Sequence, residues 1–130
     1  VHDETELAER RDLPLHAHLA QSPEELKRAY ERHGCSPAAW LEQLGMLAAR
    51  GVWAHAIYCD DADLTRLAAA DQTLVWCPYS ALVFGFPAQV TRWHGHGLRW
   101  AIATDCASTP WAASTTSSAP SQAASERLTS

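Results

Sequence analysis

The sequence predicts an α/β fold built on a parallel sheet. Four short apolar runs alternate with helical segments along most of the chain. These runs lack the strict polar alternation of half-exposed strands, which is typical of strands in a parallel sheet covered by helices. The start signal Ser-Pro opens two of the helical segments, as expected when proline occupies the first turn. With 130 residues, the chain has the length of a single domain.

The first elements follow directly from local signals. Residues 1–12 are charged and weakly periodic, as at the end of a helix. The apolar run 15–20 is bounded by prolines and has the length of a buried strand. Ser22 is predicted to cap the next helix, because Pro23 follows it and Glu25 stands three residues later as in a capping box. A glycine then ends this helix.

The central elements repeat the pattern. A second Ser-Pro start at Ser36 predicts a helix that extends to Gly51, and residues 52–58 form the second strand. Residues 61–70 form a helix with aspartates in its first turn, which the helix dipole favours. The third strand is expected over residues 73–77, closed by a proline.

The last expected helix spans residues 87–96, and the last strand spans 98–104. This order of strands and helices is that of parallel βα units. Residues 109–130 are rich in Ser, Thr and Ala, and such a composition buries too little apolar surface to offset the entropy of ordering. We therefore expect a folded domain over residues 1–108 and a disordered tail over 109–130.

The composition excludes several kinds of partner. The net charge is −5 and the basic residues are scattered, so the chain lacks the positive patch required by phosphate backbones and anionic membranes. No apolar run reaches the roughly 18 residues that cross a bilayer. Charged residues occupy the region where a signal peptide would be apolar, and widely spaced cysteines indicate reduced thiols. We expect a cytoplasmic protein that binds neither nucleic acid nor membranes.

Candidate chemistry lies at the carboxyl ends of the strands, where parallel α/β folds bind their ligands. His18, His55, Cys77 and Asp105 stand at these ends. Imidazole and carboxylate groups suit zinc, iron or manganese, so His18, His55 and Asp105 predict a divalent metal site. A metal there would acidify water to near neutrality, and Asp105 would take its proton.

The same residues have structural interpretations. A single histidine in an apolar strand is more often a satisfied core group than a ligand, and Asp105 could cap a following helix. His16 shares a strand face with His18 and is equally well a packed residue. Cationic side chains near helix ends favour the dipole, so purely structural roles are expected for His33, His94 and His96.

Four motifs, spread over about residues 13–108, resemble the amidohydrolase superfamily in its branch of cytosine deaminases, guanine deaminases and chlorohydrolase-like enzymes. They occur at the predicted strand ends in the family's order, resembling H-x-x-E of its fifth strand, A-H-C of its sixth, H/C-P-x-S-N of its seventh and G-T-D of its eighth. In this sequence they read His18-Leu19-Ala20-Gln21, Ala54-His55-Ala56, Cys77-Pro78-Tyr79-Ser80-Ala81 and Ala103-Thr104-Asp105.

The resemblance implies the second half, strands five to eight, of a (βα)₈ barrel. It implies a metal-dependent hydrolase, with zinc or alternatively iron, that acts on carbon–nitrogen non-peptide bonds or carbon–halogen bonds of nitrogen heterocycles. By position, His18 would bind the metal, and Asp105 would both bind it and accept a proton. His55 would bind a second ion or polarise the attacked centre, and Ser80 would line the substrate pocket.

The sequence departs from the family pattern in three places. The H-x-H of the first strand, which supplies two further ligands, has no counterpart. Gln21 replaces the glutamate that shuttles protons, and an amide can orient a substrate but cannot act as a general acid. Ala81 replaces an asparagine. The family's closing helix and β domain have no counterpart after Ser108, so we expect a truncated or frame-disturbed coding sequence.

Two functions therefore stay open. The first is a metal-dependent hydrolase in which Gln21 and Ser80 contact the substrate, present as a fragment that need not be active alone. The alternative is a non-catalytic half-barrel that folds only on self-association or with a complementary half. Open sheet edges favour pairing between chains, so we expect self-association through the barrel edges.

Overall fold

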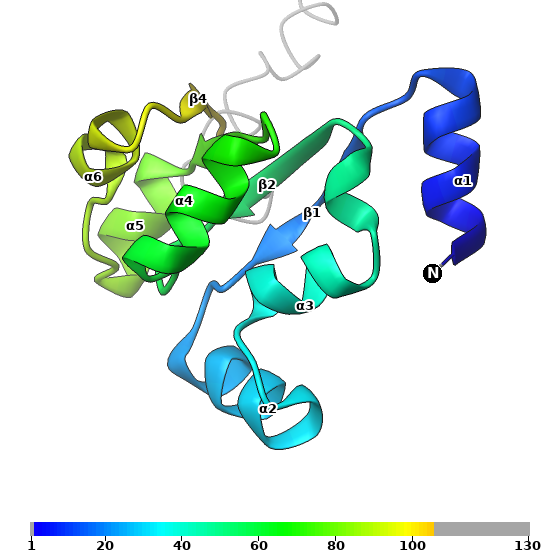
Figure 1. The fold of residues 1–130 in the computed structure, drawn as a ribbon. Coiled ribbons are helices and arrows are strands. Elements are labelled where there is room, and N and C mark those ends of the chain that lie inside the picture. The colour runs from blue at the N-terminus through cyan, green and yellow to red at the C-terminus, as the bar shows by residue number, and fades with distance from the viewer. Residues whose placement is uncertain (1, 106–130) are drawn as a thin grey trace, which may run out of the picture.

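The computed structural model describes residues 2–105, which form a four-stranded sheet with the order β1-β2-β3-β4. All three strand pairings are parallel, so the predicted α/β fold with a parallel sheet is confirmed (Figure 1). The tail expected over residues 109–130 lies outside the described residues. The strands are β1 (Leu15–Leu19), β2 (Gly51–His55), β3 (Thr73–Trp76) and β4 (Arg99–Ile102).

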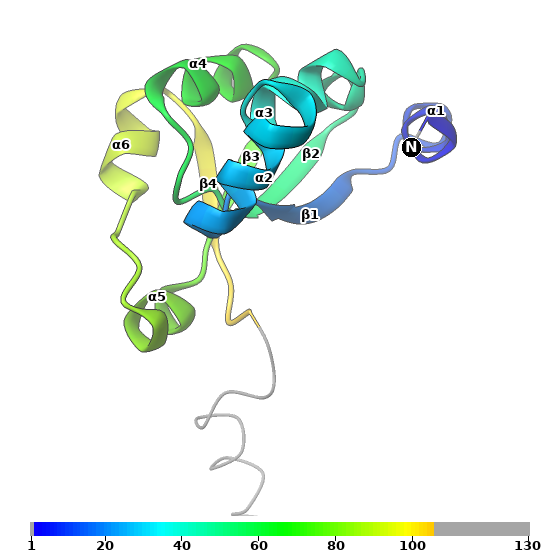
Figure 2. The ribbon, with the colours of Figure 1, turned by 90° about the horizontal axis from the view of Figure 1, so that it is seen from below.

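Helical segments connect successive strands and carry the predicted caps. The side chains of Ser22 and Ser36 accept hydrogen bonds from backbone amides three residues later. Figure 2 shows α1 standing beyond β1, apart from the other helices. None of the described helices has the length and apolar character of a membrane span. The helices are α1 (His2–Arg11), α2 (Pro23–His33), α3 (Pro37–Gln43), the 3-10 turn η1 (Met46–Ala48), α4 (Asp61–Ala69), α5 (Pro78–Phe84) and α6 (Val90–Gly95).

Three helix predictions need correction. The helix predicted from Ser36 to Gly51 ends at Gln43, because Gly45 adopts a left-handed φ of 75° and starts the separate turn η1. The helix α5 was not predicted, although proline in its first turn and a left-handed glycine after its end are its sequence signals. The helix expected over residues 87–96 begins later, at Val90.

The main core lies between one face of the sheet and the helices. Trp53 and Leu74 of the sheet pack with Leu64 and Leu67 of α4 and with Trp93 of α6. A smaller apolar cluster lies on the other face of the sheet, formed by Ala54, Val75 and Cys77 with Val52 against it. The sheet therefore carries apolar clusters on both faces, and the larger one is formed with the helices.

The two edge strands are more exposed than the sequence suggests. All four residues of β4 are exposed, including Trp100 at 39% and Ile102 at 62%. The three middle residues of β1 are exposed as well, so the prediction of a buried strand over residues 15–20 is wrong for this part of the run. Within the described residues, β1 and β4 each have a neighbouring strand on one side only. Apolar side chains of these two strands therefore stay exposed although their sequences are apolar.

Candidate metal centre

His18, His55 and Asp105 come together where the strands end. His18 lies near the end of β1, His55 is the last residue of β2, and Asp105 follows β4. One ligating atom from each residue lies within 4.8 Å of the others. Atoms bound to one zinc ion lie roughly 3.4 Å apart, so modest side-chain rotations would bring all three onto a single ion. Of the residues named by the sequence, these three thus form a cluster.

Strand register and unusual backbone angles position these side chains. His18 pairs with Ala54 and Leu19 pairs with His55, so the ends of β1 and β2 are adjacent. His55 and Asp105 each have a φ of 75°, a region that non-glycine residues rarely occupy. Such strain costs of order 1–3 kcal/mol per residue and persists where the surrounding structure enforces it, often at functional sites.

Within residues 2–105, Nε2 of the buried His55 ring has no hydrogen-bond partner. Its side chain is 2% exposed, and Nε2 lies 3.8 Å from Oδ2 of Asp105, too far for a hydrogen bond. The ring of His18 meets it edge-on, with centroids 4.7 Å apart. Burial lowers the pKa of His55, and the nearby Asp105 carboxylate offsets only part of this effect. A neutral imidazole with an unshared lone pair is the form that binds a metal ion, so this donor set fits a divalent cation.

Ser80 and Gln21, which the sequence assigned to the substrate, lie beside the candidate ligands. Ser80 is 2% exposed and donates a hydrogen bond of 2.5 Å to Oδ2 of Asp105. In the tautomer with its proton on Nδ1, His18 donates to Oε1 of Gln21 at 3.4 Å. Partners of this kind fix the ring tautomer of metal-binding histidines and orient ligating carboxylates. The sequence reasoning missed these contacts, although the spacing of His18 and Gln21 signals the second one.

Cys77 is buried at the end of β3, and its sulfur is not part of the group of ligating atoms. Burial raises the pKa of Cys77, and the negative charge of Asp105 raises it further. The Cys77 side chain packs with Ala54 and Val75 in the smaller apolar cluster.

The remaining histidines lie away from this cluster. His33 stacks on Trp40 with ring centroids 4.0 Å apart, and His96 contacts the carboxylate of Asp61 at 3.2 Å. Both contacts fit the structural roles expected for these two residues, which stay predictions. His94 is exposed. His16 shares the His18 face of β1 but is not part of the group of ligating atoms.

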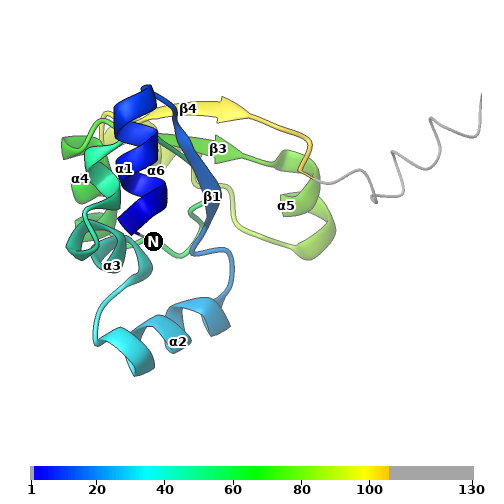
Figure 3. The same cartoon turned by 90° about the vertical axis from the view of Figure 1, so that its right-hand side faces the viewer.

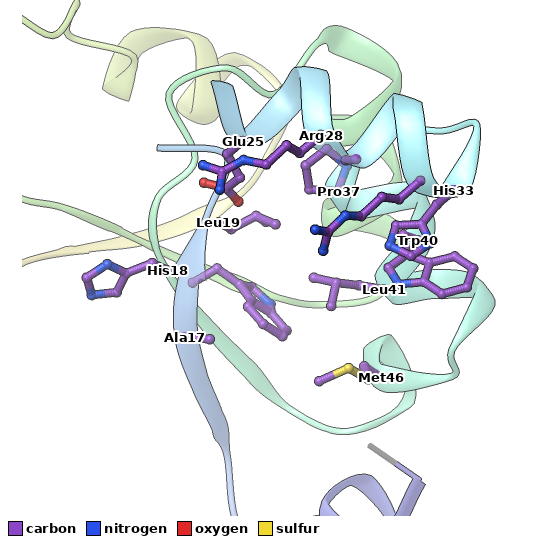
Figure 4. A pocket seen from close by; sticks show the side chains of 13 residues that line it. Ala17, His18, Leu19, Glu25, Arg28, His33, Pro37, Trp40, Leu41 and Met46 are labelled. Atoms are coloured by element: carbon purple, nitrogen blue, oxygen red, sulfur yellow. The ribbon is translucent and has the colours of Figure 1, made fainter. Parts of the chain in front are cut away.

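A groove of about 370 Å³ lies between β1 and the helices α2 and α3. Its lining includes Pro37, Trp40 and Leu41. Figure 4 shows these side chains on one side of β1 and the His18 ring on the other side. His18 also lines the groove, so the groove and the candidate metal centre share this residue of β1.

Comparison with known proteins identifies the family. The profile of the amidohydrolase family matches residues 4–124. The chain is 33% identical over 102 residues to the 5-methylthioadenosine/S-adenosylhomocysteine deaminase of Nitratidesulfovibrio vulgaris (strain DP4), covering 77% of this chain and 23% of that protein. It is also 33% identical over 104 residues to the 5'-deoxyadenosine deaminase of Methanothrix thermoacetophila, covering 79% and 25% respectively. The chain thus spans about a quarter of the length of these relatives.

Solved structures match the fold. Guanine deaminase from C. acetobutylicum with bound guanine aligns with a TM-score of 0.73 and 18% identity, over 80% of this chain and 26% of the enzyme. An adenosine deaminase from Xanthomonas campestris with bound zinc aligns with a TM-score of 0.75 and 23% identity, over 82% and 24%. Atrazine chlorohydrolase from Arthrobacter aurescens TC1 aligns with a TM-score of 0.73 and 21% identity, over 79% and 23%. The chain belongs to the amidohydrolase family, and its described residues form part of the barrel fold of these enzymes.

Proposed function

We propose that His18, His55 and Asp105 bind a divalent metal ion, preferentially zinc, in a centre that hydrolyses bonds of nitrogen heterocycles. The observation that carries this proposal is the convergence of three ligating atoms within 4.8 Å at the strand ends. The bonds are of the carbon–nitrogen non-peptide or carbon–halogen type. Relatives named for adenosine derivatives and a structural neighbour with bound guanine support a heterocyclic substrate.

Each side chain of the centre would have a different role in the reaction. A bound divalent ion would supply an acidified water as the nucleophile. Asp105 would take the proton of that water, and the hydrogen bond from Ser80 holds its carboxylate for this task. His55 stays neutral because burial lowers its pKa, so it can donate its free lone pair. Gln21 would orient His18 and a ring nitrogen or amide of the substrate.

Gln21 affects which leaving groups the centre can release. An amine must receive a proton before it departs, whereas a halide leaves as an anion. The amide of Gln21 has no titratable proton to give, so Asp105 is the carboxylate of this cluster that can return one. The centre should therefore favour substrates whose leaving group needs little protonation.

An assay of product release tests the proposal. The zinc-loaded chain is incubated with adenosine derivatives, guanine and a chlorinated triazine, and ammonia and chloride are measured. We expect zinc-dependent release from at least one heterocycle, lost in Asp105→Asn. Stoichiometric zinc binding without release from any of these substrates would contradict the hydrolase proposal for this chain.

The exposed edge strands support a second candidate, a non-catalytic unit that associates with a second copy. Trp100 and Ile102 on β4 are exposed, and an unpaired edge is a template for another strand. The β4 edge of one copy could pair with β1 of another in the same parallel sense as the existing pairs. We expect light scattering after gel filtration to show a dimer. The variant Ile102→Lys should lower the fraction of dimer. A monomer at all protein concentrations would contradict this second candidate.

A further inference from the structure

Glu25 in the first turn of α2 reaches the backbone that follows β1. Its Oε1 accepts a hydrogen bond from the amide of Ala20 at 2.8 Å, and its Oε2 accepts one from the amide of Gln21 at 2.9 Å. Figure 4 shows the Glu25 carboxylate at this end of β1, and the His18 ring projecting from one side of the strand. One carboxylate thus holds two successive amides next to a candidate ligand.

This contact is more than a helix cap. In a capping box the carboxylate returns to the amide of the N-cap residue, which is Ser22. Here it binds the two residues before Ser22 instead, and successive amides of this kind form an anion-binding nest. Ala20 is fully buried and has a φ of 48°, which is unfavourable for a residue with a Cβ. The two charge-assisted hydrogen bonds stabilise this strained turn.

The turn also forms backbone hydrogen bonds with the segment that follows β2. The carbonyl of Ala20 accepts a hydrogen bond from the amide of Tyr58 at 3.0 Å, and the carbonyl of Leu19 accepts one from Ala56 at 2.8 Å. The side chain of Gln21, at the end of the turn, lies 3.4 Å from Nδ1 of His18. A displaced turn would therefore move the Gln21 side chain away from the His18 ring, and the ring would lose the hydrogen bond that orients it.

We propose that Glu25 is a positioning residue for the metal centre, acting through the turn after β1 to orient His18. This inference rests on the proposed function, since it takes His18 as a metal ligand. Loss of an outer partner of a metal-binding histidine usually weakens metal affinity 10–100-fold. Glu25→Gln keeps one acceptor oxygen of the two, so we expect zinc affinity to fall about tenfold.

Two neighbouring variants separate positioning from helix capping. Ser22→Ala removes the hydrogen bond from the Glu25 amide to the cap hydroxyl, and Glu24→Gln removes an exposed charge of the same turn. By calorimetry we expect only Glu25→Gln to weaken zinc binding, while Ser22→Ala lowers the melting temperature and leaves zinc affinity within about twofold. Unchanged affinity in Glu25→Gln, or equal weakening in Ser22→Ala, would overturn the proposal.

A metal-free measurement keeps this test separate from the proposed function. Nitrogen-15 spectra of the histidine rings report the tautomer of His18 without any ion. We expect one dominant tautomer in the wild-type chain and in Ser22→Ala, and a mixture in Glu25→Gln. Absence of zinc binding by the wild type would contradict the proposed function alone, whereas an unchanged His18 spectrum in Glu25→Gln would contradict the role of Glu25.

Discussion

The hydroxyl of Ser80 donates a hydrogen bond of 2.5 Å to Oδ2 of Asp105, across 25 positions of sequence. Ser80 lies in α5 directly after β3, and Asp105 follows β4, so the bond joins the ends of neighbouring strands. Figure 3 shows α5 beyond the arrowheads of these two strands. The same Oδ2 atom lies 3.8 Å from Nε2 of His55. The bond thus holds the carboxylate at the face of the centre that His55 occupies.

Ser80→Ala is expected to weaken zinc affinity by about tenfold, because it frees the Asp105 carboxylate to rotate. Titration calorimetry measures this loss. Ser36→Ala is the matched control, since Ser36 is also buried and bonds a carboxylate, that of Asp63, at 2.5 Å away from the centre. It should lower stability without changing zinc affinity. A similar loss of affinity in both variants would show that the effect is one of folding.

Gln21→Glu is expected to strengthen zinc binding and to raise ammonia release relative to chloride release. A carboxylate beside His18 makes the imidazole a more basic ligand, and it supplies a second group able to protonate an amine. Calorimetry measures the affinity, and coupled assays measure the two products. A variant with unchanged affinity and an unchanged product ratio would show that position 21 touches neither His18 nor the leaving group.

The buried His55 makes stability depend on pH. Burial lowers its pKa in the folded chain, whereas in the unfolded chain it titrates near 6.5. Between these two values the unfolded chain binds more protons, so the free energy of unfolding rises with pH and is lost as pH falls toward the folded pKa. Urea unfolding of the metal-free chain from pH 4 to 8 measures the slope. His55→Asn should flatten it and His94→Asn should not, and an equal slope in all three proteins would refute this origin.

Gly51→Ala is expected to destabilise the chain by about 1–3 kcal/mol through overpacking. A Cβ at this position would lie 2.0 Å from Oε1 of Gln72 and 2.3 Å from Nε1 of Trp53, two atoms that hydrogen-bond each other at 2.9 Å. Urea unfolding measures the effect. Gly95→Ala has open space around its Cβ and should change stability by at most about 1 kcal/mol. Similar values for both variants would contradict the packing of Gln72 against β2.

The cluster of ligands was predictable from the sequence because its members lie at or just beyond the carboxyl ends of apolar runs. His18, His55 and Asp105 stand at strand ends, and a parallel sheet brings such ends to one edge. The contact of Ser80 with Asp105 was not predictable, because it depends on α5. That helix exposes Leu82 and Phe84 at 80% and 66%, so it lacks the one-sided apolar pattern by which helices are recognised.

Glu25 illustrates a different limit. The sequence correctly placed it three residues after the N-cap Ser22, which indicates a capping box. Its carboxylate binds Ala20 and Gln21 instead, because Ala20 adopts a positive φ and turns its amide toward α2. Backbone conformations of this kind arise from tertiary contacts, here between the ends of β1 and β2, and leave no trace in residue type. The exposure of β4 likewise depends on what lies beside an edge strand and not on its composition.

The zinc content of the purified chain after dialysis tests the central claim most directly. Mass spectrometry should find about one zinc ion per wild-type chain. Added zinc should also raise the melting temperature of that chain. His18→Ala and Asp105→Ala should each abolish uptake, and the exposed His94→Ala should retain it. Absence of zinc from the wild type, or equal zinc content in all three variants, would contradict a metal centre formed by His18, His55 and Asp105.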